Sequence, residues 1–282
     1  AAAAAVLHPG DEAIVLEPCY DSYVPAIRLN GGVPVFVPLT WPSYAVDWAA
    51  VAAAVTPRTR LIFVNSPHNP AGTVLGAADL DALAAIVSGT GILIISDEVY
   101  EHIIFDGLRH ESLSRHPELA ARSFVIGSFG KTFHVTGWKV GYAAAPAALT
   151  AEFRRVHQFV TFSTHTPVQY AFAEFLADRA RLAALGPFFQ RKRDLFLELM
   201  DGSRFRPLPS RGSYFQLMDY SAITDEPDAD FAVRLTREHG VASIPTSPFL
   251  HASAAPAALR FCFAKKDETL ARAAERLRDV RS

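Results

Sequence analysis

The segment from Ser128 to Gly141 contains a lysine whose surroundings favour chemistry by its amine. Lys131 follows a short apolar run, Phe124 to Ile126, which has the character of a buried strand. Burial removes some of the water that stabilises an ammonium group, so the pKa of the lysine falls and its free amine becomes a nucleophile. We therefore predict that Lys131 can form an imine with a carbonyl compound. The alternative is an ordinary solvated surface lysine.

Polar side chains follow four predicted strands at the points where these strands end. Because the carboxyl ends of parallel strands meet at one edge of a sheet, these side chains should line one crevice. They are Tyr20 after Ile14 to Leu16, Asn65 and Asn69 after Leu61 to Val64, Asp97 and Tyr100 after Ile92 to Ile95, and Ser128 and Lys131 after Phe124 to Ile126.

This set of side chains matches the needs of pyridoxal phosphate. The coenzyme is an electron sink only while its ring nitrogen is protonated, and a buried carboxylate such as Asp97 can hold that proton. The other roles that we predict are hydrogen bonds to the ring hydroxyl oxygen from Tyr100 and Asn69, ring stacking by Tyr20, and phosphate binding by Ser128 and Lys139.

Apolar runs that alternate with helical patterns predict an α/β fold with a mostly parallel sheet between helices. The second half of the chain has a different pattern and indicates a smaller α+β domain. Further strands are predicted at 33–37, 214–218 and 241–244. Helices are predicted at 22–30, 47–55, 79–88, within 110–122, at 150–162, 167–185, 188–201, 230–239 and 267–280.

Composition narrows the class of protein. The chain has 282 residues, a formal net charge of −2 and no basic stripe, so nothing indicates nucleic-acid binding. The longest apolar runs are too short to span a membrane. Two cysteines and ten histidines without zinc-type spacing predict neither a disulfide framework nor a metal site, which suits the reducing cytoplasm. A phosphate loop ending at Lys131 is excluded because Val125 stands where its first glycine is required.

Several motifs together resemble class I aminotransferases, which are pyridoxal phosphate enzymes of fold type I. The similarity runs the whole length of the chain, and two of the motifs resemble the methionine and kynurenine aminotransferases in particular. The motifs are Asn65-Ser66-Pro67-His68-Asn69-Pro70-Ala71-Gly72, Ser96-Asp97-Glu98-Val99-Tyr100, Ser128-Phe129-Gly130-Lys131-Thr132-Phe133 and Leu259-Arg260-Phe261-Cys262-Phe263, with Glu17-Pro18-Cys19-Tyr20-Asp21-Ser22-Tyr23 and Gly137-Trp138-Lys139-Val140-Gly141 for the subgroup.

The resemblance implies a sheet of the seven-stranded type in a large domain at residues 1–178, a small domain at 179–282, and a homodimer with the active site at the subunit interface. It also implies that Arg260 clamps the substrate α-carboxylate. The residues support this role, since Arg260 alternates with apolar neighbours and its planar fork pairs both carboxylate oxygens. The alternative for Arg260 is a surface ion pair.

By resemblance the activity is a two-stage, ping-pong transamination from methionine or an aromatic amino acid, including kynurenine, to a 2-oxo acid. Lys131 then carries the proton between the substrate and the coenzyme. Gly212 to Phe215 fits the family as a lining of the substrate side. Cys19, Tyr23 and Phe249 are candidate pocket residues with ordinary packing as the alternative, and we assign no role to His134.

Two features leave alternatives open. The family has a segment before the position of Ala1, with a Gly-rich phosphate loop, that we do not find in this sequence, so a non-catalytic member of the fold is one alternative. A carbon–sulfur β-lyase has the same fold and lysine, and pyruvate release from cystathionine without an added oxo acid would indicate it. A hydrolase has little support, because Ser128 lies in no nucleophile elbow.

Overall fold

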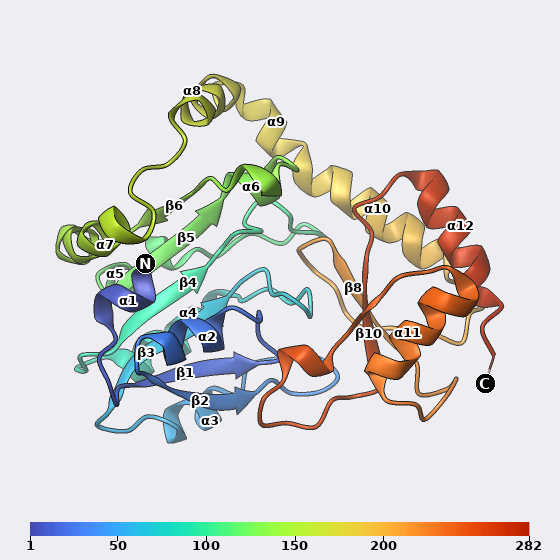
Figure 1. The fold of residues 1–282 in the computed structure, drawn as a ribbon, viewed down its shortest axis with the longest axis horizontal. Helices are drawn as coiled ribbons and strands as arrows, with labels where there is room; N and C mark the ends of the chain where they lie inside the picture. The colour runs from blue at the N-terminus through green and yellow to red at the C-terminus, as the bar shows by residue number, and fades with distance from the viewer. Residues whose placement is uncertain (282) are drawn as a thin grey trace.

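A computed structural model describes residues 1–281 and contains two β-sheets with helices packed around them (Figure 1). The first sheet has six strands among these residues, in the order β2-β1-β3-β4-β5-β6. All neighbouring pairs are parallel except β5 and β6. The strands are β1 (Glu12–Glu17), β2 (Val33–Pro38), β3 (Thr59–Asn65), β4 (Leu93–Asp97), β5 (Ser123–Ser128) and β6 (Gly141–Ala144). The α/β class with a mostly parallel sheet is confirmed, and the antiparallel strand β6 was not predicted.

Helices cover both faces of the first sheet, because its strands are apolar on both sides. Along β3, Leu61 and Phe63 face one cluster of buried residues, whereas Ile62 and Val64 face the other. The first cluster includes residues of α1 (Ala2–Val6), α2 (Tyr23–Leu29) and α7 (Ala147–Val160). The second includes residues of α3 (Trp48–Ala53), α4 (Ala77–Val87) and α5 (Pro117–Ala120).

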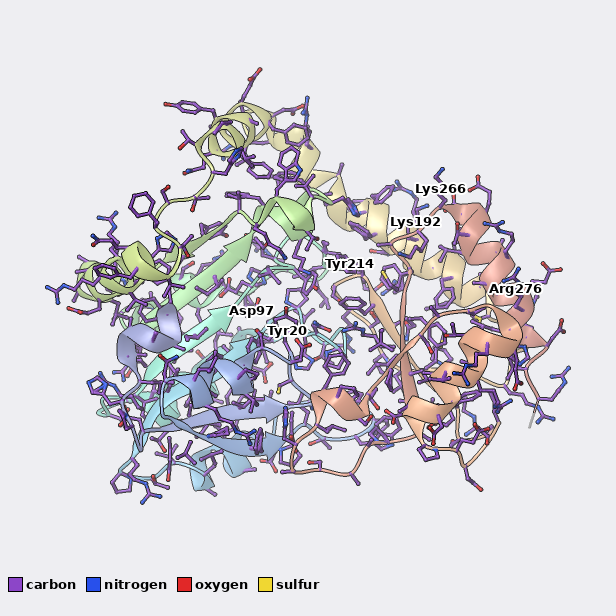
Figure 2. All side chains as sticks on the ribbon, viewed as in Figure 1. Tyr20, Asp97, Lys192, Tyr214, Lys266 and Arg276 are labelled. Atoms are coloured by element: carbon purple, nitrogen blue, oxygen red, sulfur yellow. The ribbon has the colours of Figure 1, made fainter. Side chains whose placement is uncertain are left out.

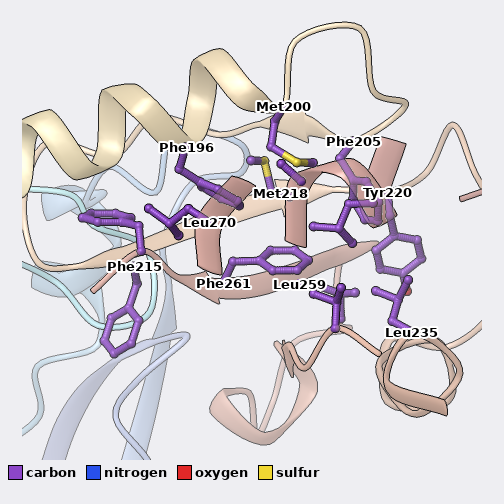
Figure 3. Packing of buried hydrophobic residues seen from close by; sticks show 14 of the residues in the cluster. Phe196, Met200, Phe205, Phe215, Met218, Tyr220, Leu235, Leu259, Phe261 and Leu270 are labelled. Carbon is purple, nitrogen blue, oxygen red and sulfur yellow. The ribbon is translucent and has the colours of Figure 1, made fainter. Parts of the chain in front are cut away.

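The second sheet is antiparallel and small, with the order β7-β8-β10-β9. Its core is rich in aromatic side chains and includes Phe196, Leu259 and Phe261, which lie close together in Figure 3. Its elements are β7 (Arg206–Pro207), β8 (Phe215–Asp219), β9 (Ile244–Pro245), β10 (Ala258–Cys262), α10 (Leu185–Leu199), α11 (Asp228–His239) and α12 (Asp267–Arg278). The alternation predicted around Arg260 is observed, since Leu259 and Phe261 are buried in this core and Arg260 faces away from it.

Four predictions of secondary structure are wrong in detail. The segment 167–185 is not one helix but α8 (Thr166–Phe175) and α9 (Arg179–Ala183), because Asp178 caps a new helix by accepting a hydrogen bond from the Ala180 N–H at 3.1 Å. The helix predicted at 188–201 begins earlier, as α10 at Leu185, because Pro187 lies in its first turn, where proline is tolerated. The predicted strand at 241–244 is only the two residues of β9.

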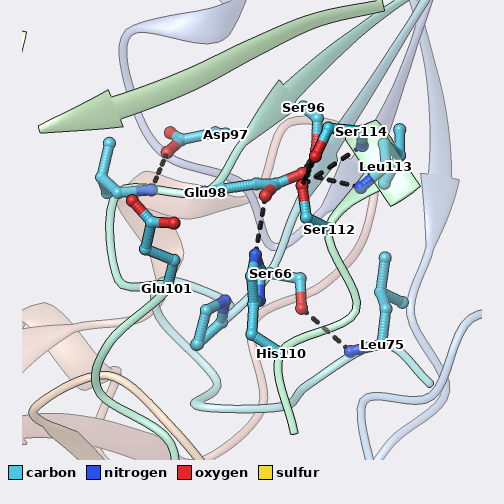
Figure 4. Close-up of polar contacts among 12 residues, drawn as sticks. Ser66, Leu75, Ser96, Asp97, Glu98, Glu101, His110, Ser112, Leu113 and Ser114 are labelled. Carbon is cyan, nitrogen blue, oxygen red and sulfur yellow. Dashed lines mark hydrogen bonds and ion pairs between the residues drawn. The ribbon is translucent and has the colours of Figure 1, made fainter. Parts of the chain in front are cut away.

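The segment 110–122 is mostly irregular, with a 3₁₀ turn, η1 (Leu113–Arg115), before the single turn of α5. A buried carboxylate explains this. Glu98 accepts hydrogen bonds from the Leu113 N–H at 3.0 Å and the Ser96 hydroxyl at 2.8 Å, and it contacts His110 Nε2 at 2.6 Å (Figure 4). These contacts fix the segment beneath the end of β4 and leave no continuous helix. None of the helices within residues 1–281 is both long and apolar enough to cross a bilayer.

Candidate active site

The strands β1 to β5 bring the predicted site residues to the edge of the first sheet that faces the second sheet (Figure 1). A cavity of about 460 Å³ on the sheet face covered by α1, α2 and α7 reaches this edge at Tyr20, Tyr23 and Asp97, and Lys131 and Arg260 do not line it. Figure 2 labels Tyr20 and Asp97 at this place. The parallel arrangement therefore does what the sequence predicts for side chains that follow neighbouring strands.

Asp97 is the last residue of β4 and is partly buried. Its Oδ2 accepts a hydrogen bond of 2.5 Å from the Tyr23 hydroxyl, and its Oδ1 accepts one of 3.2 Å from the Val99 N–H. Burial raises the pKa of Asp97, and both hydrogen bonds and the charge of Lys131 oppose that rise. Asp97 can therefore hold a proton or a positive charge at the cavity wall.

Lys131 lies in α6 (Phe129–Thr132), a single turn that follows β5, and its side chain is half-buried. Its Nζ is 6.0 Å from the centroid of the Tyr100 ring. Burial lowers the pKa of Lys131, the carboxylate of Asp97 raises it, and the positive charges of Lys139 and Arg260 lower it further. The balance favours the neutral amine more than in water, as a nucleophile requires.

Arg260 points from β10 toward the first sheet. Its Nη1 donates a hydrogen bond of 2.6 Å to Asn69 Oδ1, which joins two of the predicted residues across 191 positions of sequence. The guanidinium contacts two aromatic rings, with its Cζ 4.0 Å from the Phe215 centroid and 4.9 Å from that of Phe249. Burial lowers the pKa of Arg260. A half-buried fork beside apolar rings can bind a carboxylate strongly, because little water competes for it.

Asn69 is fixed by a residue to which the sequence assigned no role. The Asn65 carboxamide accepts from the Asn69 N–H at 2.8 Å and donates to the carbonyl oxygens of Asp97 at 2.8 Å and Pro67 at 3.2 Å. Asn65 therefore ties the ends of β3 and β4 together. Its position directly after an apolar strand was the only signal in the sequence.

Tyr100 is buried and packs edge to face against Tyr214, with ring centroids 5.1 Å apart. Burial raises the pKa of Tyr100 well above its ordinary value, so its hydroxyl stays protonated and can donate a hydrogen bond. Tyr214 belongs to the predicted substrate-side segment and is labelled in Figure 2. No hydrogen bond links Tyr100 to Asn69 within residues 1–281.

Ser128 and Lys139 are less tightly organised. Ser128 ends β5 at the position that pairs with Gly141, and its carbonyl oxygen accepts from the Thr132 hydroxyl. Lys139 is exposed and adopts a left-handed conformation with φ of 54° at the end of η2 (Thr136–Trp138). The structure brings both residues to the β5–β6 side of the edge but gives their side chains no shared partner in the described chain.

The remaining candidates differ in their surroundings. Cys19 is buried, and burial raises the pKa of its thiol to about 12, so it is no nucleophile. Tyr23 and Phe249 are buried and contact the site through Asp97 and Arg260. His134 is exposed, with its ring 5.3 Å from Phe189. Within residues 1–281 no group of three or more histidine, cysteine or acidic side chains could hold a metal ion.

Similarity to known proteins agrees with this geometry. Residues 1–277 match the family model for aminotransferases of class I and II. The methionine aminotransferase of Escherichia coli K12 is 48% identical over 281 residues, which are 99% of this chain and 73% of that one. The mouse kynurenine–oxoglutarate transaminase 3 is 35% identical over 300 residues, covering 96% of this chain and 66% of that one.

Solved structures give the same result. An E. coli protein with a methionine aminotransferase function superposes with a TM-score of 0.96 at 48% identity, covering 98% of this chain and 74% of that one. N-Succinyldiaminopimelate aminotransferase from Mycobacterium tuberculosis superposes with a TM-score of 0.95 at 38% identity, covering 99% and 74%. The fold, the family match and these identities together show that the chain belongs to the class I and II aminotransferases, in the part of the family that resembles methionine and kynurenine aminotransferases.

Proposed function

We propose that this chain transfers the amino group of an L-amino acid, methionine or an aromatic or kynurenine-like one, to a 2-oxo acid by a ping-pong sequence. The observation that carries the proposal is the convergence of one half-buried amine, one partly buried carboxylate and one half-buried guanidinium. These are Lys131, Asp97 and Arg260, and the charges of the other two act on the amine of Lys131. The identity of 48% to an E. coli methionine aminotransferase supports the choice of donor.

The side chains at the sheet edge fit pyridoxal phosphate, which the family generally uses. A carboxylate has about four acceptor positions, and hydrogen bonds to Asp97 occupy two of them, so a further donor such as a protonated ring nitrogen can be accepted. Tyr20 is 39% exposed at the cavity and can stack on a flat ring. When bound, the coenzyme supplies the electron sink that stabilises negative charge at the substrate α-carbon.

We assign the other contacts to the coenzyme from the same edge of the sheet. The Tyr100 hydroxyl and the Asn69 side chain would hydrogen-bond its ring oxygen, while the Ser128 hydroxyl and the Lys139 ammonium would hold its phosphate. Lys131 Nζ would take the proton from the substrate α-carbon and deliver it to the coenzyme, a task for which its lowered pKa suits it.

Substrate selection is assigned to the side of Arg260. Its guanidinium pairs with the α-carboxylate beside Asn69, and the rings of Phe215 and Phe249 exclude water from that pair. The apolar rings beside Arg260 suit the side chain of methionine or phenylalanine.

Two further statements are part of the proposal. We infer a homodimer with the active site at the subunit interface, supported by exposed apolar side chains on α7, the turn after it and α8 that include Phe159, Phe162 and Tyr170. We also infer a cytoplasmic location, supported by the free thiols of Cys19 and Cys262. The division into domains at 178 and 179 stays a prediction.

The test combines spectroscopy with substitution. Pyridoxal phosphate added to the protein should give a visible absorbance band that Lys131→Ala lacks, because the alanine has no amine to bind the aldehyde. Methionine or phenylalanine should bleach the band, and aspartate should not. Arg260→Lys serves as the matched comparison, since it should keep the band and raise the KM for the amino acid by about 100-fold, the effect of losing a bidentate pair.

Other results would contradict the proposal in distinct ways. A band that survives Lys131→Ala would exclude this lysine as the point of attachment. Pyruvate release from cystathionine without an oxo acid would indicate the β-lyase instead. No band in the unsubstituted protein would favour a member of the fold without turnover.

A further inference from the structure

The carboxylate of Glu17 lies at the carboxyl end of β1 and is only 1% exposed. All of its hydrogen bonds in the described chain come from one short segment that follows η3 (Ser247–Phe249). Its Oε2 accepts from the His251 N–H at 2.8 Å, and its Oε1 accepts from the Ser253 N–H at 2.8 Å and the Ser253 hydroxyl at 2.7 Å. The Ala252 N–H lies between them, at 3.2 and 3.3 Å from the two oxygens.

No cation pairs with Glu17 in the described part of the chain, so these four donors replace the water that a carboxylate would otherwise bind. A buried charge that lost them would be strongly disfavoured. Glu17 therefore requires the segment 251–253 to stay in place, and the segment requires Glu17, since its three N–H groups have their acceptor there.

Two more contacts strengthen the same junction. The Cys19 N–H donates to the Phe249 carbonyl oxygen at 2.8 Å, and the rings of Phe36 and His251 stack with centroids 5.1 Å apart. The first sheet thus holds residues 249–253 by a carboxylate, a backbone hydrogen bond and a ring stack. This is a built contact between the two sheets and involves no residue assigned to the coenzyme.

The held segment reaches the substrate side through Phe249. Phe249 is 5% exposed, and its ring is one of two aromatic rings that contact the Arg260 guanidinium, the other being that of Phe215. If residues 249–253 moved away, this ring contact would be lost, and water would reach the cation whose pKa burial lowers. The position of Phe249, and with it the environment of Arg260, depends on Glu17.

We propose that Glu17 is a positioning residue that latches residues 249–253 onto the end of β1 and so keeps the Arg260 site closed for the substrate carboxylate. The inference rests on the proposed function for Arg260. The site then has two parts with separate roles. The latch serves carboxylate binding, whereas Lys131 in α6 and Asp97 in β4 do not contact it. Loss of the latch should weaken amino acid binding and leave proton transfer largely intact.

The test substitution is Glu17→Gln, which keeps the shape but turns an NH₂ group toward backbone donors. We expect a rise of about 10-fold in the KM for methionine and in the Kd of 3-phenylpropanoate, a non-reacting carboxylate probe, with kcat within about threefold. Hydrogen exchange should show lost protection of the amides of residues 251–253. If Glu17 served folding alone, its substitution would lower kcat and protein yield, and would not raise the KM while leaving kcat nearly unchanged.

The same strand offers a matched control. Glu12 is a buried carboxylate at the opposite end of β1, where it accepts hydrogen bonds from Thr56 and Arg58. Glu12→Gln should leave both the KM and the Kd unchanged. Ser253→Ala removes one hydrogen-bond donor to Glu17 and should raise the KM and the Kd about threefold. This variant tests the proposal if Glu17→Gln does not fold.

The outcomes distinguish the latch from the proposed function. The latch is wrong if Glu17→Gln changes neither the Kd of 3-phenylpropanoate nor the hydrogen exchange of residues 251–253. If Glu17→Gln does not fold, the same result in Ser253→Ala overturns the latch. If the unsubstituted protein transaminates no amino acid, and Arg260→Lys binds the probe as well as the unsubstituted protein does, the proposed function fails instead. Equal effects of Glu12→Gln and Glu17→Gln would also overturn the latch.

Discussion

The hydroxyl of Tyr23 is the one side-chain donor to the carboxylate of Asp97 among the described residues. Its hydrogen bond lowers the pKa of Asp97 against the rise caused by burial, so Tyr23→Phe should raise that pKa further. Asp97 is then more often neutral and holds a protonated ring less firmly. We expect the Kd of pyridoxal phosphate, measured by fluorescence quenching, to increase by about 3- to 10-fold, the effect of one hydrogen bond of ordinary strength.

A matched control lies in the second sheet, where the buried Tyr220 donates to the Glu226 carbonyl oxygen at 2.8 Å. Tyr220→Phe removes an equivalent hydroxyl far from Asp97 and should leave the Kd unchanged. An unchanged Kd in Tyr23→Phe as well would show that the orientation of Asp97 does not depend on this hydroxyl.

His68 predicts a dependence of stability on pH. It is fully buried, and burial lowers the pKa of its imidazole to about 4. Because the folded-state pKa lies below the unfolded value of about 6.5, the stability that neutral His68 contributes is complete above pH 6.5. It is lost as the pH falls toward 4, by about 3 kcal/mol in total, and no further below that.

The measurement is the free energy of unfolding from urea denaturation at pH 7, 5.5 and 4. His68→Asn can still accept from the Ala71 N–H, which bonds His68 Nδ1 at 3.3 Å, and should show a smaller loss between pH 6.5 and 4. His8→Asn, at an exposed position, should keep the slope of the unsubstituted protein. Equal slopes in all three proteins would assign the acid sensitivity to other groups.

A site residue could be predicted from the sequence when its position follows from the residues next to it. Asp97 and Lys131 each follow an apolar strand directly, so a local pattern places them at the sheet edge. The bond from Tyr23 to Asp97 joins positions 74 apart, and the contact of Glu17 with Ser253 joins positions 236 apart. No local pattern encodes such contacts, because they depend on how the two sheets come together.

At the scale of elements, α10 is joined to the segment after β4 by a buried arginine. Arg193 is 7% exposed and donates to both oxygens of Asp106, at 2.8 and 2.7 Å, and to the Ser210 carbonyl oxygen at 2.9 Å. The guanidinium beside Asp106 lowers the pKa of that carboxyl. Asp106→Ala leaves the buried charge with fewer partners and should lower the free energy of unfolding by about 1–3 kcal/mol.

Urea denaturation measures this change, and the comparison is Asp178→Ala, since Asp178 pairs with Arg181 at the surface. Losing an exposed ion pair should lower the free energy of unfolding by about 0–1 kcal/mol. Losing the cap of α9 should cost about 1 kcal/mol more, and this second effect is confined to local unfolding of α9. A loss in Asp106→Ala no larger than at Asp178 would mean that Asp194, the other partner of Arg193, is sufficient.

Elements with clear termini were predicted well, and those shaped by distant contacts were not. Asp47 caps α3 by accepting from two N–H groups, and Gly240 ends α11 with a φ of 64°, as their residue types indicate. The segment 110–122 failed because the buried Glu98 takes the Leu113 N–H. Strand β6 was missed because Gly141 to Ala144 has no strand-like composition and is defined only by its pairing with β5.

At the scale of the whole molecule, apolar side chains are exposed along α7, the turn after it, and α8, on the outer side of β6 (Figure 1). Phe159 is 85% exposed, Phe162 82% and Tyr170 75%. Val160, at the end of α7, is exposed as well. Monomers rarely leave such a group of large apolar side chains in water, so this surface is where we place the homodimer contact.

Charges introduced on this surface should separate the subunits. Phe159→Glu and Tyr170→Glu together should raise the dimer dissociation constant by at least about 10-fold, because each puts a carboxylate into an apolar contact. Sedimentation velocity over a range of protein concentrations measures this. Leu29→Glu is the matched control, since Leu29 is 86% exposed on α2 and its substitution should leave association unchanged. A protein that is monomeric before substitution, or one that Leu29→Glu dissociates equally, would show that α7 and α8 do not form the contact.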